Sequence, residues 1–173
     1  ALLYPGANQR RCRVSEVNDL MDHCRDRIGQ FNGITDFQAT SRFGRLVDAI
    51  KHGVEVGKWV DELRLWSIAA RVIDRIHANT PGALVECGVA KGTSASVLAW
   101  ASQEFSRSVW LFDSFAGLPP AGPVDEREHG PLGKHTGGCC GSMAEVKRYL
   151  TSRWPRARIS MRPGLFEDTL PIE

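Results

Sequence analysis

The residues best suited to chemistry follow a short apolar run, in the segment LVECGVAKGTS that begins at Leu84. They are a carboxylate, two glycines and two hydroxyl residues: Glu86, Gly88, Gly92, Thr93 and Ser94. Glycines let a backbone turn tightly and approach a ligand closely, and the amides that open a helix hold an anionic group. We therefore predict that this turn binds a small ligand, with the amides of Thr93 and Ser94 facing its anionic end.

A second acid extends the predicted site. Asp113 ends the next apolar run, SVWLF, and stands 21 residues after Gly92. In nucleotide sites an acid at this position accepts hydrogen bonds from the hydroxyl groups of a ribose. Two simpler interpretations stay open from the residues alone: Glu86 caps the next helix or pairs with Lys91, and Asp113 only forms a turn.

The glycine spacing restricts which nucleotide this turn accepts. The dinucleotide pattern G-x-G-x-x-G is absent, since GVAKGTS contains only G-x-x-x-G, and a pyrophosphate needs the missing glycine. The segment GPLGKHT is not a P-loop, because Glu128 occupies the place of its first glycine. S-adenosylmethionine fits better: its carboxylate suits the helix amides, its ribose suits Asp113, and its cationic amine and sulfonium suit Glu86.

Periodic apolar residues predict the elements that position these groups. Helical spacing runs from Val17 to Ile28, from Phe43 to Val54, and from about Trp59 to His77. After Gly82 the pattern changes to short strand-like runs, ALVECG, SVWLF and ARISMRP. The first two have the composition of strands buried on both faces.

The residues between these strands predict crossover helices. Ser94–Phe105 has helical spacing, and Ser142 with Glu145 forms a capping box before the next helical stretch. Strand, helix, strand, helix, strand is the order of a parallel α/β sheet with right-handed crossovers. We therefore predict an α/β fold with a Rossmann-like sheet, preceded by amphipathic helices.

This order predicts two parts of the chain. Residues 1–58 are expected to cover an acceptor site or to mediate contacts between subunits, and residues 59–173 to form the ligand-binding half of the sheet. The first strand of such a sheet lies in its middle, and an uncovered apolar edge promotes aggregation. The chain is therefore expected to be a fragment of a longer polypeptide.

Composition places these elements in a globular protein. Of 173 residues, 42% are hydrophobic and 24% are charged, and the net charge of +2 argues against field-driven binding to nucleic acid or a membrane. No apolar run approaches the roughly 20 residues of a membrane span, and the first residues lack the apolar core of a secretory signal. The five cysteines are odd in number and scattered, which indicates reduced thiols and a cytoplasmic protein.

Three blocks of the sequence together resemble the macrocin O-methyltransferase (TylF/MycF-like) family. They are LVECGVAKGTS, VWLFDSFAGLPP and MRPGLFEDTLP, in this order, with the helix-forming AEVKRYL before the last. The resemblance covers roughly Trp59 to Pro171. It implies a class I methyltransferase sheet, of which this chain holds the first half, and methylation of sugar hydroxyls of natural products with S-adenosylmethionine.

The resemblance also implies roles for individual residues around the methionine and ribose of that cofactor. Glu86, Gly88 and Ser94 would surround the methionine portion. Asp113 would hold the ribose, with Ser114 beside it.

For the adenine and the catalytic groups the resemblance implies less. Gly164, Phe166 and Glu167 would lie by the adenine, although an aromatic residue such as Phe166 fits a core position equally well. The family depends on magnesium, and its metal-binding and catalytic aspartates lie in later strands and loops. No catalytic residue and no metal ligand is therefore identified in this chain.

Two segments invite other interpretations. The stretch from Pro119 to Gly141 holds two histidines and two adjacent cysteines: His129, His135, Cys139 and Cys140. Their spacing fits no common zinc finger, so a flap over the cofactor is predicted instead. The basic segment SRWPRARISMR has no aromatic platform beyond Trp154, which favours a solvated helix-to-strand connection over RNA binding.

The sequence thus predicts an S-adenosylmethionine-dependent O-methyltransferase that acts on a hydroxyl group of a small glycosylated or polyketide-like metabolite. It is expected to form a homo-oligomer and to bind neither nucleic acid nor membrane. Two alternatives remain: a nucleotide-dependent oxidoreductase, and a catalytically inactive methyltransferase-like partner protein.

Overall fold

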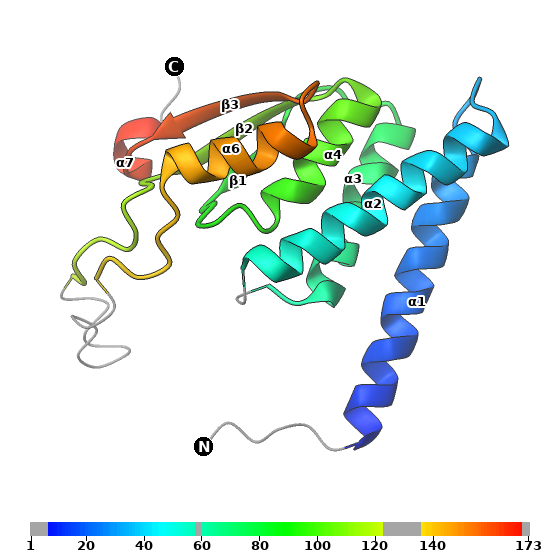
Figure 1. The fold of residues 1–173 in the computed structure, drawn as a ribbon, viewed down its shortest axis with the longest axis horizontal. Helices are drawn as coiled ribbons and strands as arrows, with labels where there is room; N and C mark the ends of the chain where they lie inside the picture. Colours follow the sequence, from blue (N-terminus) through cyan, green and yellow to red (C-terminus); the bar gives the residue numbers. More distant parts are fainter. Residues whose placement is uncertain (1–6, 58–59, 123–135, 171–173) are drawn as a thin grey trace.

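The computed structural model describes residues 7–57, 60–122 and 136–170. Three helices come first: α1 (Ala7–Gly29), α2 (Asp36–Val56) and α3 (Glu62–His77). The rest alternates between strands and helices: β1 (Leu84–Cys87), α4 (Ala95–Phe105), β2 (Ser108–Asp113), α6 (Met143–Arg153), β3 (Arg158–Pro163) and α7 (Phe166–Thr169). The strands form one parallel sheet in the order β1-β2-β3, which confirms the predicted α/β fold (Figure 1).

Side-chain caps set the helix starts that periodicity alone missed. α2 begins well before Phe43, because the Thr35 hydroxyl accepts from the Gln38 amide at 3.2 Å and the Gln38 side chain accepts from the Thr35 amide at 2.9 Å. α3 begins at Glu62, because the Asp61 carboxylate accepts from the Arg64 amide at 3.0 Å. The predicted start near Trp59 lies outside the described residues.

The amino-terminal helices and the sheet share one hydrophobic core. Cys24 and Ile28 of α1 and Leu46 of α2 are fully buried in the same cluster as Val109 and Leu111 of β2. The predicted division at residue 58 therefore does not separate two cores. The roles predicted for residues 1–58 stay predictions.

The two faces of the sheet differ. α4 and α6 both cover the face that carries Val109 and Leu111, because two successive right-handed crossovers in one direction place their helices on the same side (Figure 1). On the other face Val85 is 56% exposed and Cys87 is exposed. The prediction that β1 is buried on both faces is therefore wrong for the described part of the chain.

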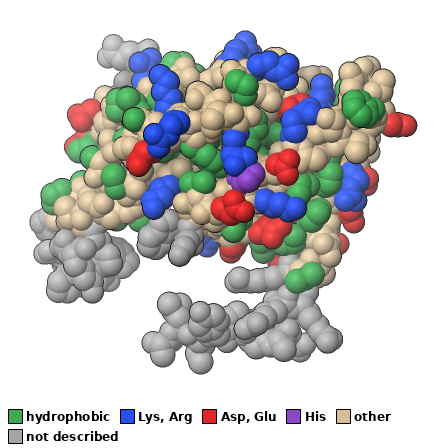
Figure 2. All heavy atoms as spheres, viewed as in Figure 1, with side chains coloured by type: hydrophobic (Ala, Val, Ile, Leu, Met, Phe, Trp, Pro, Cys, Tyr) green, Lys and Arg blue, Asp and Glu red, His purple; other side chains and the backbone are tan. Residues whose placement is uncertain are grey.

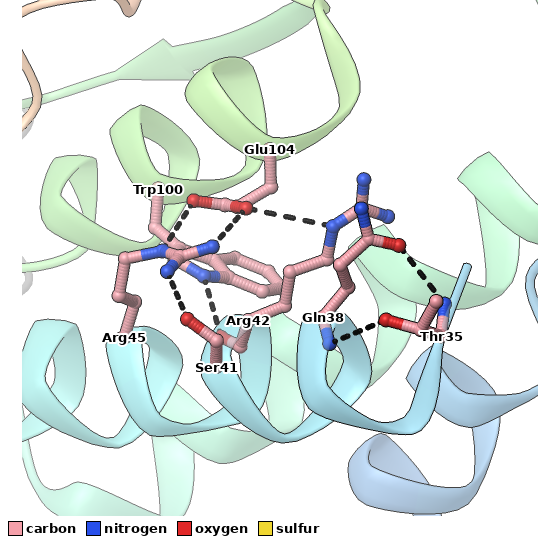
Figure 3. A network of polar contacts seen from close by, with 7 residues as sticks. All are labelled: Thr35, Gln38, Ser41, Arg42, Arg45, Trp100 and Glu104. Atoms are coloured by element: carbon pink, nitrogen blue, oxygen red, sulfur yellow. Dashed lines mark hydrogen bonds and ion pairs between the residues drawn. The ribbon is translucent and has the colours of Figure 1, made fainter.

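An ion pair fixes α4 against α2. The Arg45 guanidinium donates to both carboxylate oxygens of Glu104, through Nε and Nη2 at 2.7 Å each, and the Glu104 side chain is only 5% exposed (Figure 3). Close by, the indole Nε1 of Trp100 donates to the Arg42 carbonyl at 3.1 Å. These contacts orient α4, whose first residues follow the glycine turn after β1.

The surface agrees with the mixed composition. Figure 2 shows acidic and basic side chains interspersed across the displayed face. In residues 7–57, 60–122 and 136–170, no helix is both long and apolar enough to cross a membrane.

We predict that Glu104→Gln lowers the free energy of unfolding by about 2 kcal/mol, because the amide has one acceptor oxygen in place of two: one hydrogen bond from Arg45 is lost, and the other loses the charge of its acceptor. Urea denaturation followed by tryptophan fluorescence measures this change. Glu55→Gln is the matched control, since Glu55 is 70% exposed and its ion-pair partner among the described residues is His52; the substitution is expected to cost under about 0.5 kcal/mol. Equal effects of the two substitutions would show that the pair does not anchor α4.

Candidate ligand-binding site

The turn after β1 is held against the end of β2. Gly88 and Gly92 have φ values of +87° and +85°, which glycine alone adopts readily. The Gly88 amide donates to the Phe112 carbonyl at 2.9 Å, and the Gly92 amide donates to the Val89 carbonyl at 2.8 Å. The predicted tight bend at the carboxyl end of β1 is therefore present.

Asp113 uses its carboxylate to hold two loops. Oδ2 accepts from the amides of Val89 at 2.7 Å and Ala90 at 2.9 Å, and Oδ1 accepts from the Phe115 amide at 2.7 Å. The last bond makes Asp113 a turn former, which was one of the open interpretations. A carboxylate has about four acceptor positions, so one remains for a ligand hydroxyl.

Glu86 has an unsatisfied oxygen in a buried position. The Ser94 hydroxyl donates to Oε1 at 2.5 Å, whereas Oε2 is inaccessible to solvent and has no hydrogen-bond partner among the described residues. Burial raises the pKa of Glu86 to about 7, the Ser94 hydrogen bond opposes this rise, and the nearby Asp113 charge adds to it. A cationic group beside Oε2 would offset the cost of ionising this carboxyl group.

Neither simple interpretation of Glu86 is found. In the described part of the chain its carboxylate pairs with the Ser94 side chain and makes no ion pair with Lys91. Ser94 is the N-cap residue of α4 but forms no side-chain cap, because its hydroxyl is turned to Glu86. The pair is thus a buried polar contact beneath the turn rather than a helix cap.

A cavity of about 530 Å³ opens beyond the carboxyl ends of the strands. This is within the usual size of a small-molecule site, and it lies where parallel α/β sheets bind ligands. Six of the ten predicted site residues line it: Gly88, Asp113, Ser114, Gly164, Phe166 and Glu167.

The other four predicted residues lie outside this lining. Glu86 and Ser94 form the buried pair described above. Gly92 faces α6, where an added Cβ would approach the Val146 side chain to 3.2 Å. The Thr93 side chain is 6% exposed and packs against Gly57, so it is part of the helical core. The anion-binding role of the Thr93 and Ser94 amides stays a prediction.

Phe166 is not a core residue. It is 44% exposed, begins the short helix α7 and faces the cavity beside Gly164, whose φ is +143°. The alternative interpretation of Phe166 as a core side chain is therefore wrong. An exposed ring in a cavity wall offers a flat apolar surface to a ligand.

Two loops form another wall of the cavity, and one of them contains Pro119, Gly138 and Cys139 of the segment that was predicted to lie over the cofactor. Leu118 and Gly138 pair through their backbones, since the Leu118 amide donates to the Gly138 carbonyl at 2.9 Å. Gly117 permits this approach: its φ is +88°, and an added Cβ would lie 2.8 Å from the Gly138 carbonyl oxygen. The glycine and proline residues of FAGLPP were the available signal, because such residues mark close backbone approaches.

The cysteine loop yields no metal site among the residues described. Cys139 lines the cavity, and the Cys140 thiol donates to the Phe115 carbonyl at 3.7 Å. The predicted zinc alternative also involves His129 and His135, which lie outside the described residues. Within residues 7–57, 60–122 and 136–170, no group of three or more His, Cys, Asp or Glu side chains could hold a metal ion.

Comparisons with known proteins agree with this fold. The model of the family described as Macrocin-O-methyltransferase (TylF) matches residues 57–173. The demethyldecarbamoylnovobiocin O-methyltransferase of Streptomyces niveus is 33% identical over 115 residues, which cover 62% of this chain and 44% of that protein. A solved structure of the O-methyltransferase NovP matches with a TM-score of 0.55 and 32% identity, over 62% of this chain and 47% of that one. The chain thus spans less than half the length of both relatives.

We predict that Glu86→Gln stabilises the protein increasingly as pH rises. The folded state holds the Glu86 proton up to about pH 7, whereas the unfolded chain releases it near pH 4.5. The free energy of unfolding of the natural chain therefore decreases between these pH values. The glutamine variant has no such loss. The difference in unfolding free energy should therefore grow by about 3 kcal/mol between pH 4.5 and 8.

Urea denaturation at half-unit pH intervals measures this difference. Glu55→Gln again serves as the control and should show a difference from the natural chain that does not vary with pH by more than about 0.5 kcal/mol. A flat difference for Glu86→Gln would mean that the carboxyl group is not buried in solution.

Proposed function

Because the chain belongs to the macrocin O-methyltransferase family, we propose that the complete protein is an S-adenosylmethionine-dependent O-methyltransferase. Its acceptor is proposed to be a hydroxyl group of a small natural product, on a sugar of a glycosylated or polyketide metabolite. The names of the family and of the novobiocin relative support this class of acceptor. The observation that carries the proposal is the buried, half-satisfied carboxylate of Glu86 beneath a turn that borders the 530 Å³ cavity.

The residues present fit this cofactor. The carboxylate of Glu86 lies buried beneath the turn, and its charge would favour a cationic amine of the methionine portion bound above that turn. The remaining acceptor position of Asp113 is suited to a ribose hydroxyl, and the exposed ring of Phe166 to stacking on the adenine. Gly164 and Glu167 border the same end of the cavity.

Methyl transfer places clear demands on these residues. S-adenosylmethionine, when bound, would supply a methyl group that an acceptor oxygen attacks, and S-adenosylhomocysteine would be the leaving group. The chain contributes by fixing the donor: Asp113 holds the turn, the charge of Glu86 beneath the turn favours the cationic end of the ligand, and Phe166 offers its ring to the other end. Such positioning contributes a large share of the rate acceleration of a two-substrate reaction. The base that accepts the hydroxyl proton is not assigned to any described residue.

Two further parts of the proposal concern the complete protein. Residues 1–58 are proposed to cover the acceptor or to mediate contacts between subunits, since α2 packs against α4 and Gly57, just after α2, lies against Thr93 of the glycine turn. Magnesium dependence is an expectation from the family resemblance alone. The described residues offer no cluster of metal ligands.

Ligand binding separates this proposal from its alternatives. Isothermal titration calorimetry with S-adenosylhomocysteine is expected to show a single site, and NADH is expected not to compete. Phe166→Ala should weaken S-adenosylhomocysteine binding about tenfold, since base–aromatic stacking contributes about 1–3 kcal/mol. Phe37→Ala is the control, because Phe37 is 82% exposed at the far end of the strands. NADH competition would favour an oxidoreductase, and an unchanged affinity for Phe166→Ala would contradict the adenine position.

The affinity for S-adenosylmethionine should also depend on pH. Below about pH 7 Glu86 takes up a proton and loses its attraction for the cationic amine, so the dissociation constant should rise by up to about tenfold per pH unit between pH 7 and 5. In Glu86→Gln the affinity should be lower at pH 8 and nearly independent of pH. A pH-independent affinity of the natural protein would exclude Glu86 from the cofactor site.

Binding without turnover in the complete protein would favour the inactive-partner alternative.

A further inference from the structure

A second cavity lies at the other end of the strands. It has a volume of about 490 Å³ and is enclosed by the first half of α2, the end of α4 and the connection between α6 and β3. α4 ends at Phe105 and β3 begins at Arg158, so this cavity borders the amino ends of the strands. The proposed cofactor cavity borders their carboxyl ends, and the two share no lining residue.

Four arginines line the second cavity, and Glu104 is the acidic residue in its lining. Arg42 and Arg45 come from α2, and Arg156 and Arg158 come from the α6–β3 connection. Arg45 engages both oxygens of Glu104, and Arg42 reaches the same carboxylate only through Nε at 3.6 Å. Figure 3 shows the terminal nitrogens of Arg42 directed away from Glu104. The buried carboxylate of Glu104 is therefore the ion-pair partner of both guanidinium groups.

Arg156 and Arg158 are fixed by their backbones and leave their charges available. The Arg156 amide donates to the Gln103 side chain at 3.3 Å, and the Arg158 amide donates to the Ser102 hydroxyl at 2.8 Å. Both residues are exposed, and no carboxylate of the described residues lies within 4.0 Å of either guanidinium. Figure 2 shows basic side chains at the upper rim of the molecule, over the turn from α6 to β3.

The lining therefore carries three positive charges in excess of its one negative charge. Like charges that converge on one cavity repel each other, and an anion that enters relieves this repulsion. The planar fork of arginine donates two parallel hydrogen bonds to a phosphate or carboxylate. Phe37, which is 82% exposed, adds an apolar ring to the same lining. The cavity is larger than a single phosphate and within the range for a small organic ligand.

We propose that this cavity binds a phosphorylated small molecule with two or more negative charges, of the nucleoside diphosphate type. The diphosphate contacts the guanidinium groups of Arg42, Arg156 and Arg158, and the flat organic part rests against Phe37. Binding here is independent of the cofactor cavity and of methyl transfer. The proposal goes beyond the proposed function and holds whether or not the protein is a methyltransferase.

Isothermal titration calorimetry of the full-length protein tests this proposal with pyrophosphate, ADP, adenosine and citrate as probes. Saturating S-adenosylhomocysteine is present throughout, so that the cofactor cavity cannot take up adenosine groups. We expect pyrophosphate and ADP to bind with submillimolar dissociation constants, ADP more tightly, and adenosine not to bind. Citrate binding as tight as that of pyrophosphate would overturn the phosphate class, and tighter binding of a single-stranded RNA oligomer would instead indicate a nucleic-acid surface.

Substitutions assign the binding to this cavity. Arg156→Gln with Arg158→Gln should weaken pyrophosphate binding at least tenfold, since two charge-assisted contacts are lost. These side chains are exposed and unpaired among the described residues, so circular dichroism and the melting temperature should stay unchanged. Arg71→Gln, an exposed arginine on α3, is the matched control and should retain full affinity. Equal losses in both variants would show a general charge effect and overturn the site.

Phe166→Ala separates the two cavities. It should weaken the binding of S-adenosylhomocysteine, whereas the affinity for ADP in the titration with saturating S-adenosylhomocysteine should stay unchanged. A parallel loss of ADP affinity would place ADP in the cofactor cavity and overturn the second site. Failure of S-adenosylhomocysteine to bind would contradict the proposed function alone, and the pyrophosphate result would still stand.

Discussion

Asp113 joins the loops that follow the three strands, through its side-chain carboxylate and its main-chain carbonyl. The side chain accepts from the amides of Val89 and Ala90 in the first loop and from Phe115 in the second. The Asp113 carbonyl accepts from the Gly164 amide in the third at 3.0 Å. The four donors lie in the loops that follow β1, β2 and β3, so one residue at the end of the central strand sets the relative positions of these loops. A side chain that accepts from three backbone amides is expensive to move.

This constraint explains how strained backbone persists at the site. Ala90 and Phe115 have φ values of +47° and +53°, which non-glycine residues seldom adopt. Both donate their amides to Asp113, so the hydrogen bonds offset the conformational cost. The turn held in this way covers the pair of Glu86 and Ser94. A carboxyl group can remain buried with a free oxygen only where the surrounding backbone cannot relax to satisfy it.

The sequence predicted those features that follow from local chemistry. Apolar periodicity identified the helices and strands, and the pair of Ser142 and Glu145 marked the start of α6. Glycines marked the turn after β1, because few other residues adopt its φ values. What lies between elements was not predictable: the backbone pairing of Leu118 with Gly138, and the exposure of Phe166, depend on where distant loops come to rest. The exposure of one face of β1 was likewise not predictable, because it follows from the packing of both crossover helices on the opposite face of the sheet.

α4 connects the two ends of the sheet and is fixed to α2 at each of them. Its first residues follow the glycine turn, and its last turn carries Glu104, which Arg45 anchors to α2. Ser96 adds a second link, since its hydroxyl bonds the Thr93 carbonyl at 2.7 Å and the Ala49 carbonyl of α2 at 3.0 Å. The helix is thus tied to the same neighbour at both of its ends. α2 is therefore structurally part of the ligand-binding domain rather than an appendage to it.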